Sequence, residues 1–161
     1  MTDLPMFLML IGIPGSGKST WLNSPWAKVY LKDFTIVCPD DIRREIYKNV
    51  SDQSDNANVM FVAKERAIRL LTDQKSVIID ATNVNTKYRR EFIEGLPPCK
   101  MVAKFFDELP HICCGRVREA IEKGIDRADV PDEVIYRMYG EYLYTKKVYV
   151  SEGFVPSYPA F

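Results

Sequence analysis

Residues 12–20 read GIPGSGKST and fit the pattern G-x-x-x-x-G-K-[S/T]. Before them lies a nearly continuous apolar run, residues 6–11, which is typical of a parallel strand covered on both faces. Gly12 and Pro14 end this run, and the residues from Lys18 to about 23 are expected to begin a helix. A strand, a glycine-rich loop and a helix in this order predict a phosphate-binding loop.

Phosphate binding explains why this loop is rich in glycine. Several backbone N–H groups must come close to phosphate oxygens, in conformations that a side chain would obstruct. The amino end of the following helix adds partial positive charge. We expect Lys18 to contact the β- and γ-phosphates of ATP and the Ser19 hydroxyl to bind Mg²⁺. The residues predicted to bind the nucleotide are Gly12, Pro14, Gly15, Ser16, Gly17, Lys18, Ser19 and Thr20.

The motif has two limits as a guide to function. An ordinary Gly/Pro turn that contains Lys-Ser is the simpler alternative, and the full spacing with its strand context disfavours that alternative. The motif itself indicates only that a nucleoside triphosphate binds. GTPases, ATPases, transport subunits and kinases all share it, so the choice among them depends on other residues.

Strands and helices alternate along the rest of the chain. This alternation predicts a parallel sheet with right-handed crossovers. We therefore expect an α/β P-loop kinase fold, with a central parallel sheet flanked by helices on both faces and a small helical lid. Its 161 residues suit one domain, with the lid at about 113–130. The further strands are expected at 35–38, 76–79 and 101–106, and the further helices at 40–47, 57–72, 110–123 and 132–144.

Composition excludes several other classes of protein. The 22 Lys and Arg balance the 22 Asp and Glu, so a nucleic-acid partner must be met by a local basic patch. The 4 cysteines show no CxxC pair and no metal-ligand spacing, which argues against a zinc site or a disulfide framework and fits a reduced, cytoplasmic setting. No stretch approaches the roughly 20 apolar residues of a membrane helix, so we expect no membrane partner.

Acidic and basic side chains follow the second expected strand within residues 38–44, CPDDIRR. The carboxyl ends of parallel strands meet at one edge, so these residues should lie beside the phosphate loop. A kinase needs a carboxylate to accept the proton of the attacking hydroxyl, and a guanidinium can hold an acceptor phosphate. Asp40 and Arg43 are three apart and share one face of a helical turn. The simpler alternative is that Asp40 is an N-cap and Arg43 a surface charge.

Three further groups of residues are candidates for the site. Asp80 ends an apolar strand, as a Walker B acid does, and is expected to reach magnesium, although a carboxylate that caps the following turn is the alternative. A basic cluster at 87–90, KYRR, could hold a polynucleotide backbone and stack a base, or could be a solvated helix face. The cations available to a lid are Arg116, Arg118, Lys123 and Arg127.

These segments together resemble the kinase domain of phage polynucleotide 5′-kinases and of the related bacterial end-healing kinases. The resemblance covers residues 6 to 145, nearly the whole chain. It rests on GIPGSGKSTW at 12–21, DDIR at 40–43, DATN at 80–83 with Arg89 and Arg90, and VPDEVI at 130–135 with Met138.

The resemblance implies transfer of the ATP γ-phosphate to the 5′-hydroxyl end of RNA or DNA, in the cytoplasm, or in the host cytoplasm if the protein is phage-encoded. It implies Asp40 as general base. The Lys123-Gly124 turn followed by Arg127 leaves both of these cations as candidates for the γ-phosphate. Some family members carry their acid where Ala81 stands, which favours a metal role for Asp80. The residues that the resemblance assigns to substrate are Asp40, Arg43, Thr82, Asn83 and Arg89.

The resemblance also bears on the extent of the activity. Some family members carry a fused phosphatase domain that this sequence lacks, so we expect phosphorylation of 5′ ends without removal of 3′-phosphates. Two other functions remain open at this stage. One is a kinase for a nucleoside, nucleotide or sugar, with the same ATP apparatus and a closed acceptor pocket. The other is a non-catalytic nucleotide switch or regulatory ATPase, in which Asp40 is only a cap.

Overall fold

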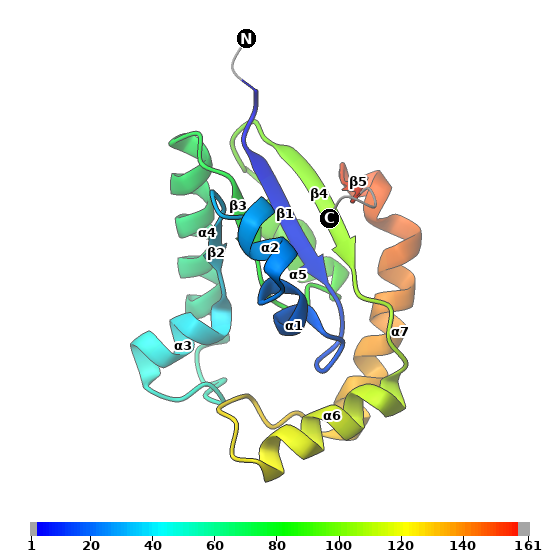
Figure 1. The fold of residues 1–161 in the computed structure, drawn as a ribbon. Helices are drawn as coiled ribbons and strands as arrows, with labels where there is room; N and C mark the ends of the chain where they lie inside the picture. Colours follow the sequence, from blue (N-terminus) through cyan, green and yellow to red (C-terminus); the bar gives the residue numbers. More distant parts are fainter. Residues whose placement is uncertain (1–2, 158–161) are drawn as a thin grey trace.

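The structure is a computed structural model that describes residues 3–157. Five parallel strands form one sheet with the order β2-β3-β1-β4-β5 (Figure 1). The strands are β1 (Met6–Ile11), β2 (Thr35–Val37), β3 (Val77–Ile79), β4 (Lys100–Phe105) and β5 (Val155–Pro156).

Strand β1 lies at the centre of the sheet, between β3 and β4. Its register pairs Leu8 with Ile78 on one side and with Val102 on the other. Successive side chains point to opposite faces, so Phe7, Met9 and Ile11 enter one buried cluster while Leu8 and Leu10 enter another. Both faces of β1 are therefore buried, which explains why the run at 6–11 is apolar at every position.

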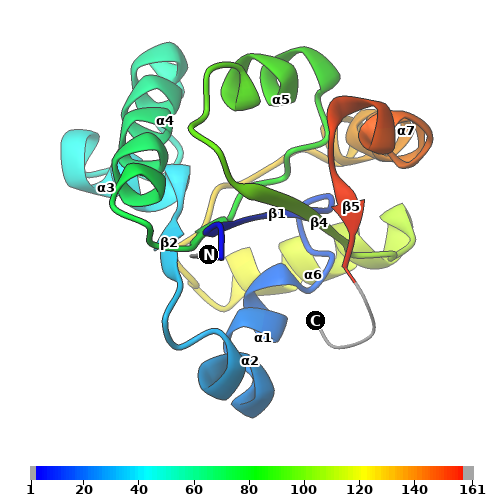
Figure 2. The same cartoon turned by 90° about the horizontal axis from the view of Figure 1, so that it is seen from above.

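Helices cover both faces of the sheet, which confirms the predicted architecture (Figure 2). Helices α4, α5 and α7 lie on one face, α1 and α2 lie on the other, and α6 crosses near the carboxyl ends of the strands (Figure 1). The helices are α1 (Lys18–Leu22), α2 (Pro25–Tyr30), α3 (Pro39–Tyr47), α4 (Asn56–Thr72), α5 (Thr86–Ile93), α6 (Pro110–Glu122) and α7 (Asp132–Val148), followed by the 3₁₀ turn η1 (Tyr149–Glu152).

The helices differ in extent from those expected. Helix α2 lies outside the expected helix ranges: Pro25 occupies its first turn, and the Ser24 hydroxyl accepts a hydrogen bond from the Ala27 N–H at 3.2 Å. Helix α7 continues for one further turn beyond residue 144, as far as Val148. Thr145 in that turn is fully buried and donates to the carbonyl of Val84, so tertiary contact favours the extension.

The turn η1 contains the carboxylate partner of a buried cation, and the extended end of α7 contributes a hydroxyl to the same network. The Arg89 guanidinium lies 2.8 Å from a carboxylate oxygen of Glu152, and the two side chains are only 0% and 2% exposed. Arg89 also donates to the Asn83 carbonyl at 2.9 Å and to the Thr145 hydroxyl at 3.0 Å. This network connects α5, α7, η1 and the segment after β3.

Replacement of Glu152 by Ala should therefore destabilise the protein by about 3 kcal/mol or more, because it leaves the Arg89 charge buried without its counter-ion. Urea denaturation followed by circular dichroism would measure the loss. Glu91→Ala is the matched control, since Glu91 pairs with Lys87 on the surface at 4.0 Å and such a pair contributes about 0.3–0.5 kcal/mol. Equal stability of Glu152→Ala and Glu91→Ala would contradict this account.

Candidate active site

A cavity of about 1700 Å³ opens at the carboxyl ends of the strands. This is larger than the roughly 300–1,000 Å³ of a pocket for one small ligand, so it has room for two substrates side by side. Its lining includes the phosphate loop, the start of α3, the segment after β3 and the loop between α6 and α7. The topology brings them together because parallel strands end at the same edge.

The phosphate loop is held tightly against its surroundings. Gly15 has a φ of +82°, and a Cβ atom there would stand 2.7 Å from the carbonyl oxygen of Cys113 in α6. A Cβ at Gly12 would lie 2.5 Å from the Ser16 hydroxyl oxygen. The Gly12 N–H donates to the Thr82 carbonyl at 3.0 Å, which fixes the loop to the segment after β3. Larger residues at these two glycines would displace the loop.

Lys18 begins α1 and turns its amine back over the loop. Its Nζ donates to the carbonyls of Gly12 at 2.8 Å and Ile13 at 3.0 Å. Burial lowers the pKa of Lys18 to about 8, and the negative charge of Asp80 partly opposes that effect. A phosphate group bound here would favour the protonated amine and raise the pKa again.

Asp80 and Ser19 both line the cavity, as Lys18 does. Burial raises the pKa of Asp80 above its ordinary value, against the favourable charge of Lys18. Within residues 3–157 no three Asp, Glu, His or Cys side chains gather into a metal site. One carboxylate and one hydroxyl nevertheless suit Mg²⁺, which binds hard oxygen ligands and usually retains several waters beside substrate phosphates. The donor set at this position therefore fits magnesium.

Asp40 and Arg43 lie on the first turn of α3 and face each other, as their spacing predicted. Arg43 Nη1 is 2.5 Å from Asp40 Oδ1, and the other terminal nitrogen of Arg43 donates to the Asn56 side chain at the start of α4. Arg43 is largely buried, and its Nε has no hydrogen-bond partner among the described residues. The Asp40 side chain is 44% exposed, so its carboxylate stays accessible from the cavity.

The loop between α6 and α7 is fastened on both sides. Arg44 of α3 donates to the Asp126 carboxylate at 2.8 Å and to the Asp126 carbonyl at 3.0 Å. On the other side, Arg118 of α6 donates to Asp129 at 2.9 Å and to Asp132 at 2.8 Å. These contacts hold the loop close to α3, near the carboxyl ends of the strands (Figure 1).

Arg127 lies in this loop, between the two fastening points. Its side chain lines the cavity, and its Nε is buried without a hydrogen-bond partner among residues 3–157. Burial lowers the pKa of Arg127, while the charge of Asp40 acts in the opposite direction. A desolvated guanidinium with no hydrogen bond, in range of the Asp40 carboxylate, is suited to receive an anionic ligand.

Two other lid cations, Lys123 and Arg116, differ in their access to the cavity. Lys123 is exposed at the end of α6, pairs with Glu119 at 2.6 Å, and does not line the cavity. Arg116 reaches the phosphate loop, where it donates to the Gly15 carbonyl at 3.1 Å and pairs with Glu108 at 2.9 Å. The structure therefore brings Arg116 and Arg127 to the cavity and leaves Lys123 outside it.

Two of the residues predicted to bind substrate are engaged within the protein. The expectation for Arg89 is wrong, because its guanidinium is buried against Glu152 and backbone carbonyls. The Asn83 amide donates to the Leu10 carbonyl at 2.6 Å, and its backbone has a φ of +53°, which indicates a role in joining the ends of β1 and β3. Thr82 and Asn83 do line the cavity.

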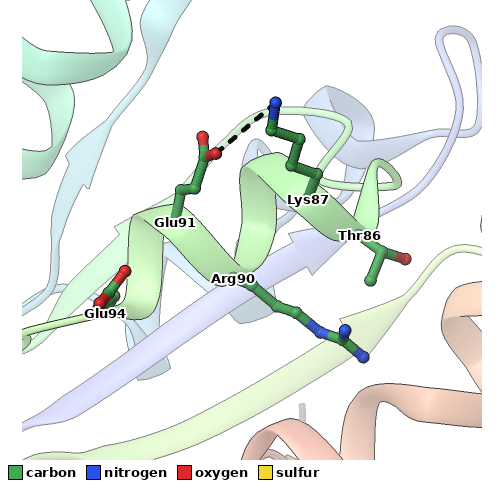
Figure 3. A pocket seen from close by; sticks show the side chains of 5 residues that line it. All are labelled: Thr86, Lys87, Arg90, Glu91 and Glu94. Carbon is green, nitrogen blue, oxygen red and sulfur yellow. Dashed lines mark ion pairs between the residues drawn. The ribbon is translucent and has the colours of Figure 1, made fainter.

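The basic cluster at 87–90 is divided by the geometry of α5. A shallow hollow on the outer side of this helix is lined by Thr86, Lys87, Arg90, Glu91 and Glu94. Figure 3 shows Lys87 and Glu91 directed toward each other while Arg90 points away from them. Arg90 pairs with Glu152 at 3.3 Å, and Tyr88 lines the main cavity instead. The cluster is therefore not one continuous basic surface.

Sequence reasoning missed several contributors to the site. Asn56 holds Arg43, and Asp126 holds Arg44, yet each pair joins positions far apart in the chain. Arg44 was visible within the segment at 38–44, but its partner was not, because no sequence spacing links residues 44 and 126.

None of the helices in the described part of the chain is both long and apolar enough to cross a membrane.

Comparison with known proteins identifies the family. The chain matches a family model described as AAA domain over residues 7–142. No curated protein sequence matches the chain. A chain in the structure of the Pnkp1/Rnl/Hen1 RNA repair complex is similar over 91% of this chain, with a TM-score of 0.72 and 23% identity. A second structure of the Pnkp1/Rnl/Hen1 complex is similar over 76%, with a TM-score of 0.56 and 24% identity.

This protein spans only 47% and 40% of those two chains. A candidate kinase from Chloroflexus aurantiacus is similar over 84% of this chain and 76% of its own length, with a TM-score of 0.68 and 15% identity. The family match extends over most of the sequence, and the solved structures share the arrangement of sheet and helices. This chain therefore belongs to the AAA domain family and has the fold of a P-loop kinase.

Proposed function

We propose that the protein is a polynucleotide 5′-hydroxyl kinase, which transfers the γ-phosphate of ATP to the 5′ end of RNA or DNA. The observation that carries this proposal is the position of Asp40, whose accessible carboxylate faces the same cavity as the phosphate loop. In this proposal residues 1–161 act as one kinase domain, and residues of about 113–130 act as its lid. The similar chain in an RNA repair complex supports a nucleic-acid substrate.

The donor side follows from the loop geometry. Residues 12–20 would hold the ATP phosphates through backbone N–H groups, and Lys18 would neutralise charge on the β- and γ-phosphates. Ser19 and Asp80 would hold Mg²⁺, which when bound offsets charge on the transferring phosphoryl group. The Gly12 N–H donates to the Thr82 carbonyl and the Gly15 carbonyl accepts from Arg116, and both contacts keep the loop in place, so positioning is the main contribution of the protein here.

On the acceptor side, Asp40 would accept the proton of the attacking 5′-hydroxyl, and Arg43 would hold the neighbouring phosphate. In the structure the Arg43 guanidinium already bonds Asp40 and Asn56, which fixes both groups at the start of α3. An acceptor phosphate would take up part of the hydrogen-bonding capacity of Arg43, including its unpartnered Nε.

Arg127 would stabilise the charge that spreads over the equatorial oxygens of the transferring phosphoryl group. It is the lid cation that reaches the cavity without a hydrogen bond or ion pair among the described residues. Its neighbour Asp126 is held by Arg44, the neighbour of Arg43. The lid cation and the acceptor helix would therefore be held in a fixed relation.

A small-molecule kinase is the second candidate, and the form of the cavity separates the two. Besides Asp40, the lining of the cavity includes Met60 of α4, Tyr88 of α5 and Met138 of α7, which extends it over three further helices. An acceptor limited to one sugar would not need this extension. Transfer of labelled γ-phosphate from ATP to a 5′-hydroxyl oligonucleotide, beside a panel of nucleosides, nucleotides and sugars, would distinguish them. Labelling of small molecules alone would contradict the proposal.

Replacement of Asp40 by Asn should lower kcat for oligonucleotide phosphorylation by about 10²–10⁴-fold, because the amide cannot accept the hydroxyl proton. ATP affinity, measured by calorimetry, should stay close to that of the wild type. Asp41→Asn is the control, since Asp41 pairs with Arg44 at 2.7 Å and is more exposed than Asp40. Full activity of Asp40→Asn would instead support the regulatory ATPase, in which Asp40 is only a cap.

Replacement of Arg127 by Ala should reduce kcat by about 10²–10³-fold with a smaller effect on the KM for ATP, because charge stabilisation is lost mainly in the transition state. Lys123→Ala removes a cation four residues earlier that lies outside the cavity, and we expect nearly unchanged steady-state rates. The opposite pattern, with Lys123 essential and Arg127 dispensable, would refute the assignment of Arg127.

Binding of ATP should take up protons above about pH 8, because Lys18 has a pKa of about 8 in the free protein and bound phosphate raises it. Below that pH the amine is protonated in both states, so uptake should vanish near pH 7 and approach about one proton per ATP near pH 9. Calorimetry in buffers with different ionisation enthalpies measures this uptake.

The control for the calorimetric experiment is Lys18→Arg, whose guanidinium is protonated at every pH used. That variant should show no pH-dependent uptake of protons on binding ATP. Equal uptake by the wild type and Lys18→Arg near pH 9 would show that another group, and not Lys18, binds the proton.

A further inference from the structure

The charged side chains that line the main cavity fall into two groups. Most of its cations are engaged within the protein, among them Arg43 with Asp40, Arg89 with Glu152 and Arg116 with Glu108. Two guanidinium groups in the lining have no ion pair or hydrogen bond with any residue in the range 3–157, namely those of Arg127 and Arg137. Arg127 lies close enough to Asp40 for their charges to interact, whereas Arg137 belongs to α7.

The position of Arg137 follows from the face of α7 that borders the cavity. Val134, Met138 and Glu141 line the cavity with Arg137 at the three- and four-residue spacing of one helical face. Glu141 accepts a hydrogen bond from the Asn85 side chain at 3.0 Å, which holds this face against the start of α5. Arg137 therefore lies one turn from that contact and is exposed to solvent.

An aromatic ring borders the same part of the cavity. Tyr88 stands one turn after Asn85 on α5, and its side chain is 57% exposed. Its backbone N–H donates a hydrogen bond to the side-chain oxygen of Asn85 at 3.0 Å. An exposed ring and an unpaired cation in the lining of one cavity can together hold a single strand, since the ring stacks on a base and the cation contacts a phosphate.

We propose that Arg137 and Tyr88 form a second acceptor subsite, which binds a phosphate and a base downstream of the nucleotide at Asp40. This inference rests on the proposed function and adds a preference to it: single-stranded ends with at least two phosphates 3′ of the reacting hydroxyl bind more tightly than a nucleoside 3′-monophosphate. Arg43 takes the first of these phosphates and Arg137 takes the next. A nucleoside 3′-monophosphate ends before it reaches Arg137.

The experiment compares two acceptors, a nucleoside 3′-monophosphate and a single-stranded 5′-hydroxyl hexanucleotide, at several salt concentrations. Arg137→Ala should raise the KM for the hexanucleotide about tenfold, leave kcat unchanged, and leave the nucleoside 3′-monophosphate unaffected. The slope of log(kcat/KM) against log salt should fall by about 0.7, the value for one phosphate contact on a single strand. Arg137→Lys should restore part of the affinity and the salt slope.

Lys147→Ala is the matched control, because Lys147 is an exposed cation on the same helix but lies outside the cavity. Arg137→Ala that behaves like Lys147→Ala on the hexanucleotide, or that impairs both acceptors equally, would overturn the subsite. If the wild type phosphorylates neither acceptor while it still binds ATP, the proposed function itself fails, and this result is distinct from the failure of the subsite alone.

Discussion

The central place of β1 in a wholly parallel sheet determines which segments can meet at the site. Every strand ends at the same edge, so the loop after β1 is flanked by the segments that follow β2, β3 and β4. Those segments contain Asp40, Asp80 and the start of α6. Burial of β1 on both faces attaches the phosphate loop to a strand that is packed on all sides, and precise positioning of phosphates requires such a support.

The loop also depends on contacts from elements that are distant in sequence. The Cys113 carbonyl leaves no space for a side chain at Gly15, and the Thr82 carbonyl binds the Gly12 N–H. The segment after β3 is supported in turn by Arg89, whose charge is balanced by Glu152 near the end of the described chain. The phosphate site is thus coupled to the C-terminal part of α7 and η1 through buried hydrogen bonds, although neither element contributes to the loop.

Charge pairing determines which cations remain available to a substrate. A cation that already has a carboxylate partner gains less from an anionic ligand, because the ligand must compete with that partner. Arg43 retains one unpartnered nitrogen, and Arg127 and Arg137 have no partner among the described residues. The contacts of Arg44 with Asp126 and of Arg118 with Asp129 act differently, since they fasten the loop that contains Arg127. Pairing in this protein therefore divides arginines that position the backbone from arginines that face the cavity.

Four strands of the parallel sheet and the phosphate loop could be predicted from the sequence, because the apolar run at 6–11, the glycine spacing and the following helix are local signals. The order of the strands and the short strand β5 could not. The sequence also placed Asp40 and Arg43 on one helical face, since a three-residue spacing fixes that relation. Only the tertiary structure decided that Arg89 is buried, that Lys123 lies outside the cavity and that Arg127 lies inside it. These outcomes depend on partners such as Glu152 and Asp126, which lie 63 and 82 positions from the arginines they bind, and no local pattern encodes such distant pairs.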